Sequence, residues 1–323
     1  MPPNATSTFK PAPWRARLWL RAKQQYGNSL HEFVRKTLPF FERMGLHLTL
    51  NHYYEPVPDT RKLRDALWSR RSELVGVNLN ESAQLALLAG LAACFKAEYD
   101  SLPLEAPPQP GRFYLNNPAF PSVDAEIFYS MIRRFKPKRI IEIGSGQSTL
   151  LAAETILKNR EEDPAYRCEL VAVEPYPSGF LKAGVPGLSR LIQQPAQEVP
   201  LEEFDALGQD DILFIDSSHV LKIGSDVQYE YLEILPRLRP GVLVHIHDIH
   251  FPSDYPKDLV LESRRFWTEQ YLLQAFLTFN DSFEVLWAGT YMHFTHPDAL
   301  AAAFKSYDRN GRWPGSFWMR RIR

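Results

Sequence analysis

The stretch Arg139 to Leu150, RIIEIGSGQSTL, decides the fold. Its first half, Arg139–Ile143, is a β-branched apolar run that is short enough for a buried strand. The glycine-serine-glycine turn at 144–146 leaves room for a sharp change of backbone direction, and a helix is predicted over Gln147–Lys158. A strand, a glycine turn and a helix N-terminus together present free backbone N–H groups, which suit an anionic or nucleotide-like ligand.

This stretch departs from two common phosphate-binding sequences. The dinucleotide fingerprint G-x-G-x-x-G needs a third glycine, and this chain has Thr149 there. A P-loop needs a Gly-Lys-Ser/Thr ending, which the stretch lacks. The residues therefore indicate a nucleotide-type site of another kind.

Length and composition set the limits of the interpretation. A chain of 323 residues has room for one large domain and a smaller one. The formal net charge of −1 argues against a broad electrostatic footprint for nucleic acid. Only Cys94 and Cys168 are present, so neither a disulfide framework nor a cysteine-rich zinc site is expected. No apolar run reaches the roughly 20 residues that span a bilayer. We expect a cytoplasmic protein with no nucleic-acid partner and no transmembrane segment.

A proline-rich stretch divides the chain. Residues 101–111 contain four prolines, which is typical of a linker. We therefore expect a mainly helical N-terminal extension over residues 1–110 and an α/β domain over residues 111–323. Within the extension, Trp14 to Tyr26 favours a helix with tryptophans on one side. The segment His52–Asp59 is a candidate substrate lid, with simple packing as the open alternative.

After the linker, apolar runs that suit strands alternate with helical patterns. The predicted strands cover 139–143, 170–173, 190–194, 211–215, 241–246, 283–288 and 316–322. The predicted helices cover 123–135, 147–158, 225–235, 261–279 and 297–307. This alternation predicts an α/β fold with a parallel sheet that is covered on both faces.

An acidic residue lies at or just after the end of four of these strands. The four are Glu142, Glu174, Asp216 and Asp248. Ligands of open α/β sheets bind outside the carboxyl ends of the strands, so we expect these acids to share one edge. Glu174 ends the run VAVE, where a carboxylate can accept both hydrogen bonds from a ribose diol.

Histidines accompany the last two acids. His219 follows Asp216 by three positions. Three further histidines surround Asp248, namely His245, His247 and His250. Two functions remain open for this cluster. One is general acid/base catalysis, because histidine titrates near neutral pH. The other is a divalent metal held by the two acids and one or two histidines.

From about Tyr114 to its end, the chain resembles the class I S-adenosylmethionine (SAM)-dependent methyltransferases. The resemblance is carried by EIGSGQST, VAVEP, LFIDSSH and HIHDIHFP. It implies a Rossmann-like, doubly wound, mostly parallel seven-stranded sheet with an antiparallel last strand. It also implies SAM as the cofactor and a small molecule as the methyl acceptor. The residues expected at the cofactor are Glu142, Gly144, Ser145, Gly146, Ser148, Glu174 and Asp216.

Metal-dependent members of this family place an Asp after the fourth strand and an Asp-Asn pair after the fifth. Asp216 and Asp248 match these positions, whereas Ile249 stands at the Asn position. We expect a divalent metal held by Asp216, His219, Asp248 and His250, with Mn, Fe or Zn favoured over Mg because imidazole suits those ions. The expected catalytic residues are His219, Asp248 and His250, with His219 preferred as the general base. The alternative keeps Asp216 for the cofactor amino group and involves no metal.

The reaction expected first is O-methylation of a hydroxyl, and N-methylation comes second. An NAD-type oxidoreductase is disfavoured by Thr149. A hydrolase using Ser217 or Ser218 with His219 is disfavoured because the chain lacks a G-x-S-x-G elbow. A catalytically silent SAM-binding scaffold is the third alternative. The expected partner is a small-molecule acceptor, and assembly into a homo-oligomer is left undecided.

Overall fold

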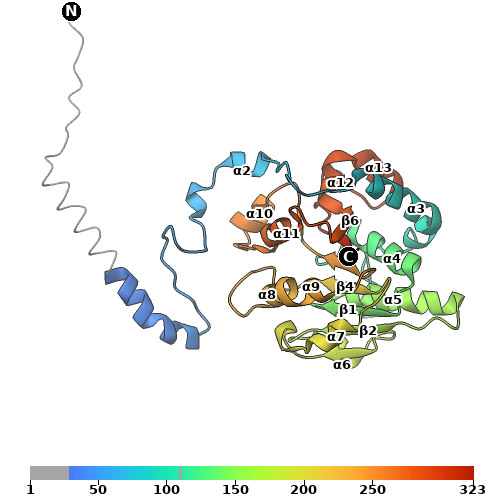
Figure 1. Cartoon of the computed structure of the whole chain (residues 1–323), viewed down its shortest axis with the longest axis horizontal. Coiled ribbons are helices and arrows are strands. Elements are labelled where there is room, and N and C mark those ends of the chain that lie inside the picture. Colours follow the sequence, from blue (N-terminus) through green and yellow to red (C-terminus); the bar gives the residue numbers. More distant parts are fainter. Residues whose placement is uncertain (1–28, 109–110) are drawn as a thin grey trace, which may run out of the picture. The chain divides into compact units, whose positions relative to one another are not determined.

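A computed structural model describes residues 29–108 and 111–323 (Figure 1). The chain divides into two compact units between Leu63 and Arg64. In the first unit, residues 29–43 are helical and a 3-10 turn, η1, covers Thr60–Lys62. None of residues 29–63 is buried. The helix predicted over Trp14 to Tyr26 lies outside the described residues.

The second unit is built on a seven-stranded sheet with the order β3-β2-β1-β4-β5-β7-β6. The strands are β1 (Arg139–Ile143), β2 (Glu169–Val173), β3 (Arg190–Ile192), β4 (Ile212–Ile215), β5 (Leu243–Ile246), β6 (Phe283–Ala288) and β7 (Phe317–Arg321). Strands β1 to β5 are parallel, and β7 is antiparallel to both β5 and β6. The predicted Rossmann-like α/β sheet with an antiparallel last strand is confirmed.

Helices cover both faces of this sheet (Figure 1). They are α2 (Asp65–Ser69), α3 (Glu81–Tyr99), α4 (Asp124–Phe135), α5 (Gln147–Glu162), α6 (Gly179–Ala183), η2 (Ala196–Glu198), α7 (Leu201–Asp205), α8 (Asp226–Tyr229), the π-helical turn η3 (Glu230–Ile234), α9 (Leu235–Arg237), α10 (Lys257–Leu261), α11 (Glu269–Leu277), α12 (Gly289–Thr295) and α13 (Pro297–Ala303). In the described part of the chain, no helix has the length and hydropathy that a bilayer span requires.

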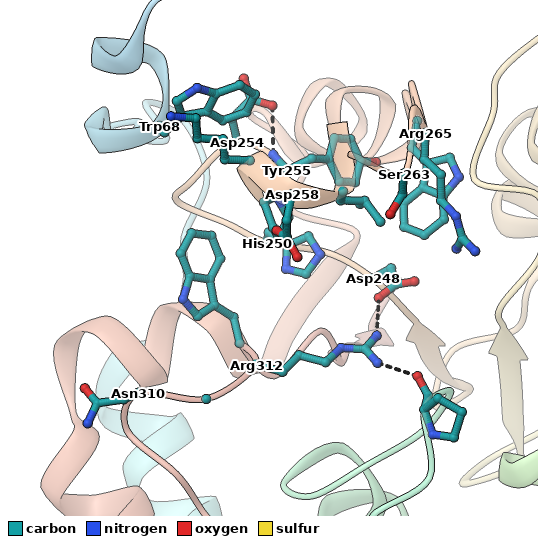
Figure 2. Close-up of a pocket in the computed structure, with 17 residues that line it drawn as sticks. Trp68, Asp248, His250, Asp254, Tyr255, Asp258, Ser263, Arg265, Asn310 and Arg312 are labelled. Carbon is teal, nitrogen blue, oxygen red and sulfur yellow. Dashed lines mark hydrogen bonds and ion pairs between the residues drawn. The ribbon is translucent and has the colours of Figure 1, made fainter. Parts of the chain in front are cut away.

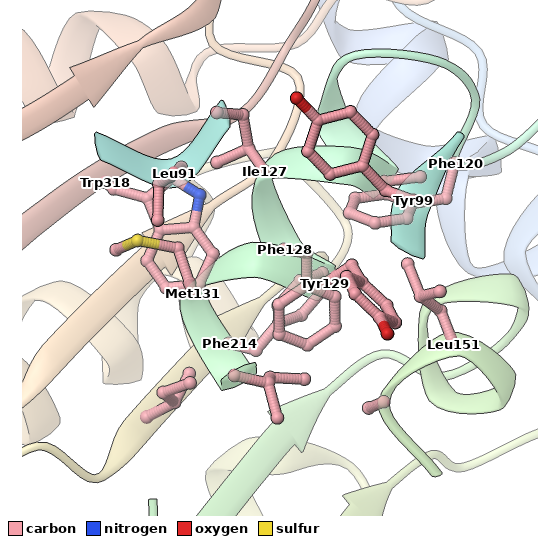
Figure 3. Packing of buried hydrophobic residues seen from close by; sticks show 14 of the residues in the cluster. Leu91, Tyr99, Phe120, Ile127, Phe128, Tyr129, Met131, Leu151, Phe214 and Trp318 are labelled. Atoms are coloured by element: carbon pink, nitrogen blue, oxygen red, sulfur yellow. The ribbon is translucent and has the colours of Figure 1, made fainter. Parts of the chain in front are cut away.

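Successive strand residues face two separate apolar cores, because strand side chains alternate in direction. Ile140 packs in a core with α3, α4 and α5, whereas Ile141 packs in a core with α7, α8 and α11. Figure 3 shows the first core, where Phe128 of α4 and Phe214 of β4 lie close together. Their ring centroids are 4.6 Å apart. Burial of both faces explains the nearly continuous apolar runs of the parallel strands.

The strand order reverses between β1 and β4, which places the topological switch point between them. Ile143, the last residue of β1, pairs with both Val173 of β2 and Ile215 of β4. Glu174 and Asp216 follow those partners directly, so the acids after β2 and β4 flank the glycine turn after β1. The shared edge predicted for the strand-end acids is therefore where the sheet opens a crevice.

One predicted helix is wrong in a way that bears on the site. The helix expected over 261–279 is broken, because α10 ends at Leu261 and α11 begins at Glu269. Between them, the backbone N–H groups of Thr268 and Glu269 donate to His219 O (2.9 and 3.2 Å). Leu221 N donates to Thr268 Oγ1 (2.8 Å). The break thus docks α11 on the loop after β4, which no local pattern in the sequence predicts.

Other helix ends also differ from prediction, and α5 continues to Glu162 instead of ending at Lys158. The helix expected to stop before Pro236 continues to Arg237. A proline clashes with the preceding turn of a regular α-helix, but here the wider π turn η3 precedes it, with Leu235 N donating to Glu230 O. The helix expected over 297–307 ends at Ala303.

The division between the compact units lies at Leu63/Arg64, whereas the sequence places the boundary in the linker at 101–111. The difference is due to α3, which packs against α4, α13 and β6. Side chains at its start also bind the edge strand β6. Asn80 Nδ2 donates to Val285 O (3.2 Å), and Ala288 N donates to Gln84 Oε1 (2.8 Å). Residues 64–100 therefore belong to the same unit as the sheet.

Candidate active site

The turn after β1 is shaped by the close approach of β4. Gly144 has φ +79°, and a Cβ there would lie 1.9 Å from the backbone oxygen of Asp216, so no other residue fits. Gly146 differs, because its backbone is extended (φ 178°) and an added Cβ would meet no atom within 4 Å. The space beside Gly146 is therefore open to a ligand.

Several buried polar atoms around this turn have no partner among the described residues. They are Glu142 Oε2, Ser145 Oγ and Gln147 Oε1. Ser148 Oγ donates to the other carboxyl oxygen of Glu142 (2.5 Å), yet burial raises the pKa of this carboxyl to about 8. An unsatisfied buried polar atom costs about 1–3 kcal/mol, so this turn fits a polar ligand that would complete its hydrogen bonds.

Glu174 lies beside the same turn. Its carboxylate accepts from Ser145 N (3.2 Å) and from Tyr176 N (2.8 Å). A cavity of about 440 Å³ lies here and is lined by Gly144, Glu174, Pro195, Ala196, Gln197 and Asp216, among others. The structure thus brings the predicted cofactor residues Gly144, Glu174 and Asp216 together around one cavity.

Asp216 also belongs to a second group, with His219 and Asp248. One ligand atom from each of the three lies within 4.8 Å of the others. His219 Nε2 is 3.3 Å from Asp216 Oδ1 and 3.7 Å from Asp248 Oδ2. His219 and Asp248 both have left-handed backbone, with φ of 59° and 55°. Such strain costs about 1–3 kcal/mol and concentrates at functional sites.

A buried carboxylate holds the other side of the His219 ring. Glu269 Oε2 is 2.8 Å from His219 Nδ1, and Tyr231 OH donates to Glu269 Oε1 (3.2 Å). Burial tends to lower the pKa of His219, but the hydrogen bonds to Asp216 and Glu269 outweigh it and raise the pKa well above its usual value. Glu269 could not be predicted from the sequence, because it lies 50 positions from His219, inside what reads as one long helix.

His247 is the second imidazole at these acids. Its Nδ1 is 3.4 Å from Asp216 Oδ1 and 3.8 Å from Asp248 Oδ1, while its Nε2 is 3.4 Å from Asp124 Oδ2. Burial opposes the charged ring, but the two strand-end carboxylates raise the pKa of His247 to about 10. The sequence placed His247 beside Asp248 without assigning it a role, and nothing in the sequence pointed to Asp124.

Like His247, His250, the fourth expected metal ligand, is not a member of the Asp216–His219–Asp248 group. Its Nδ1 is 3.3 Å from Thr290 Oγ1, and burial lowers its pKa to about 4. His250 instead lines a larger cavity. His245 is a core residue, since its ring stacks on Phe214 with centroids 4.0 Å apart.

The hydroxyls of the candidate nucleophilic serines face other residues. Ser217 Oγ donates to Glu230 Oε2 (3.1 Å), and Ser218 Oγ donates to Asp226 Oδ1 (2.6 Å). Both His219 nitrogens face carboxylates instead. The geometry therefore gives no support to the hydrolase alternative.

Two more cavities extend the site beyond the strand-end acids. The smaller one, about 430 Å³, is lined by Asp216, Asp248, His219 and His247, and it shares Asp216 with the cavity beside Glu174. The larger one, about 890 Å³, shares Asp248 and Arg312 with the smaller (Figure 2). Arg312 extends to Asp248 Oδ1 (3.1 Å) and donates to Pro118 O (2.8 Å). The wall of the larger cavity includes the aromatic residues Trp68, Tyr255, Trp267 and Trp313.

Comparison with known proteins agrees with this geometry. Residues 141–249, which include the glycine turn and all three strand-end acids after β2, β4 and β5, match a family model described as a methyltransferase domain. A relative from Archaeoglobus fulgidus, named only as an uncharacterized protein, is 32% identical over 168 residues, which cover 48% of this chain and 72% of the relative.

Two solved structures are distantly similar. A putative methyltransferase from Thermobifida fusca is 14% identical, with 80% of this chain and 97% of that chain covered and a TM-score of 0.38. The MycE methyltransferase from the mycinamycin biosynthetic pathway, in complex with Mg and SAH, is 15% identical, with 64% and 52% covered and a TM-score of 0.35. Similarity this distant says nothing about the acceptor or the metal. The family match, the fold and the turn after β1 agree, and the chain belongs to the class I SAM-dependent methyltransferases.

Proposed function

We propose that this methyltransferase acts on a hydroxyl group of a small molecule, which is held beside a divalent cation at Asp216, His219 and Asp248. The observation that carries the proposal is that Asp216 lines two cavities. One is the cavity beside Glu174, which we call the cofactor cavity. The other is the cavity of the acid–histidine group, which consists of Asp216, His219 and Asp248. A methyl donor in the first cavity and an acceptor in the second would therefore meet at this residue.

The cofactor side of the proposal uses the residues of the first cavity. Glu174 would accept hydrogen bonds from the two ribose hydroxyls, and the open space beside Gly146 would admit the cofactor against the backbone. Ser145 Oγ, buried without a partner, would gain one. These features of the cavity and the turn would suit bound SAM.

The donor atoms of the acid–histidine group suit a divalent cation. Two carboxylates and one imidazole nitrogen face one another, and a carboxylate on the far nitrogen of His219 fixes the ring, as is usual for metal-binding histidines. Mixed oxygen and nitrogen ligation suits Mn, Fe or Zn better than Mg. A bound cation would lower the pKa of an acceptor hydroxyl.

A metal-free mechanism with His219 as the general base is the competing one. Its support is the Glu269–His219 hydrogen bond, which orients the imidazole. Against it stands the position of the ring, because both nitrogens of His219 face carboxylates, Nε2 toward Asp216 and Nδ1 toward Glu269. Neither nitrogen is free to accept the acceptor's proton, so the metal-assisted version is favoured.

The acceptor side of the proposal rests on the larger cavity. Its aromatic walls and its charged residues suit a small, partly apolar molecule with polar substituents. Arg312 would hold Asp248 in place at the junction, since it already bonds the carboxylate.

The test is a screen of paired hydroxyl and amine acceptors, with release of S-adenosylhomocysteine (SAH) as the readout. The proposal expects turnover of a hydroxyl acceptor that is lost after chelation and restored by one of Mn, Fe or Zn. Turnover confined to amines would contradict the hydroxyl assignment, and full turnover in excess chelator would contradict the metal.

A further inference from the structure

We infer that His247 is a further ligand of this cation and that Asp124 orients its ring. The inference rests on the proposed function, because it concerns the same site. It replaces His250 as the second histidine and makes the site one of two carboxylates and two imidazoles.

The donor atoms of the two histidines lie in similar positions relative to Asp216. His219 Nε2 and His247 Nδ1 lie at nearly equal distances from Asp216 Oδ1, 3.3 and 3.4 Å. The two rings face different oxygens of Asp248. His219 Nε2 is 3.7 Å from Oδ2, and His247 Nδ1 is 3.8 Å from Oδ1, which Arg312 also contacts. Bonds of about 2.0–2.2 Å to a shared ion place neighbouring ligand atoms about 3–3.5 Å apart. Each imidazole nitrogen therefore lies within a few tenths of an ångström of ligand spacing from both acids.

In each ring, a carboxylate binds the nitrogen that points away from Asp216 and Asp248. This nitrogen is Nδ1 in His219 and Nε2 in His247. Glu269 binds His219 at Nδ1, which leaves Nε2 toward the acids. Asp124 binds His247 at Nε2, which leaves Nδ1 toward the same acids. A carboxylate on the far nitrogen is the usual companion of a metal-binding histidine, and here both histidines have one.

Both orienting carboxylates are themselves held in place by hydrogen bonds. Asp124 is almost completely buried at the start of α4, where it accepts from Gly315 N and Ser316 N (both 2.9 Å). Glu269 is completely buried and accepts from Tyr231 OH. Each ring is therefore held by a rigid acid, with little freedom to turn away from Asp216 and Asp248.

This donor set determines the class of ion. Imidazole nitrogens suit Zn, Fe, Co and similar transition ions, whereas Mg prefers oxygen ligands and keeps several waters. With two imidazoles instead of one, the preference for a transition ion over Mg becomes stronger. His250 contributes nothing to this preference, because its Nδ1 faces Thr290.

The competing role for His247 is that of a fixed cation that balances the acids. The two roles predict opposite changes in cation affinity when His247 is replaced. If His247 is a ligand, its removal weakens metal binding. If it is only a positive charge beside Asp216 and Asp248, its removal strengthens the binding of any cation.

The experiment titrates the metal-free, full-length protein with Co²⁺ alone, and both calorimetry and the visible absorption of the bound ion are recorded. The variants are His247→Gln and Asp124→Asn, with His250→Ala as the matched control from the same strand end. Folding of each variant is checked by its SAH affinity. We expect His247→Gln and Asp124→Asn to weaken Co²⁺ binding by about 10–100-fold and to alter the absorption spectrum. We expect His250→Ala to leave the Co²⁺ affinity of the wild type unchanged.

Unchanged or tighter Co²⁺ binding by His247→Gln would overturn the inference and leave the three-residue metal site standing. Should His247→Gln fail to fold, Asp124→Asn carries the same prediction, because it keeps the shape of the side chain and loses its charge. A wild-type protein that binds SAH but no Co²⁺ would instead contradict the metal in the proposed function itself.

Discussion

The two halves of the site are built in different ways. The cofactor half is mainly one continuous stretch, in which β1, the glycine turn and the start of α5 follow each other directly. The acid–histidine half joins segments far apart in the chain, since Asp124, His247 and Glu269 come from α4, the end of β5 and α11. A site formed by one continuous stretch can be predicted from the sequence. A site formed by distant segments cannot, because its residues come together only when the chain folds. The two halves share Asp216.

The largest effect is expected on kcat, and it should distinguish the acid–histidine half from the cofactor half. Asp248→Asn removes a charge from the acid–histidine half and leaves the cofactor cavity intact, since Asp248 does not line it. We expect kcat to fall by about 10²–10³-fold, the scale for losing one electrostatic group at a reacting centre. SAH affinity, measured by calorimetry, should stay at the wild-type value. A matching loss of SAH affinity would show that the halves cannot be separated.

The next largest effect is expected in the cofactor half. Glu174→Ala removes the carboxylate beside the turn and should weaken SAM binding by about 1.5–3 kcal/mol, the scale for hydrogen bonds to a charged group. Calorimetric titration with SAM measures it. Glu174→Gln is the conservative control and should lose less. Unchanged affinity in Glu174→Ala would refute the assignment to the ribose.

The two glycines of the turn offer a sharper contrast. Gly146→Val places its side chain in open space, so we expect a folded protein whose SAM affinity falls by about 1–3 kcal/mol, the usual cost of overpacking. Gly144→Ala is the counterpart, because its Cβ would collide with the Asp216 backbone and should lower the melting temperature instead. Wild-type SAM affinity in a folded Gly146→Val protein would mean that no ligand occupies this space.

The smallest effect is expected when the hydrogen bond that holds Glu269 against His219 is weakened. Tyr231→Phe removes one hydrogen bond to Glu269 and should cost about 0.5–1.5 kcal/mol of stability, measured by urea denaturation. Because Glu269 would hold the His219 ring less firmly, Co²⁺ affinity should also fall by a few fold. A loss of stability with unchanged Co²⁺ affinity would limit Tyr231 to a structural role.

The sequence could predict the fold and the strand-end acids for a physical reason. Parallel strands that are buried on both faces leave unbroken apolar runs, and each run ends where a polar residue reaches the edge of the sheet. Glu174 and Asp216 could be read in this way, and the structure places both beside the glycine turn. The match to a methyltransferase domain over residues 141–249 covers the same stretch.

The acid–histidine half could be predicted only in part. Asp216, His219 and Asp248 were expected together and are found together. His247 faces Asp216 and Asp248 whereas His250 faces Thr290, and the left-handed backbone of Asp248 between them has no sequence signature. Glu269 reaches His219 because the helix predicted over 261–279 is broken, and that break is stabilised by tertiary hydrogen bonds.

The most direct test of the account is the metal content and metal dependence of the purified protein. Elemental analysis should find close to one transition ion per wild-type chain and much less in Asp248→Asn. Chelation should abolish methyl transfer to a hydroxyl acceptor, and adding back that ion should restore it, while SAH binding persists throughout. Full methyl transfer by a wild-type protein that contains no metal, in excess chelator, would contradict the account.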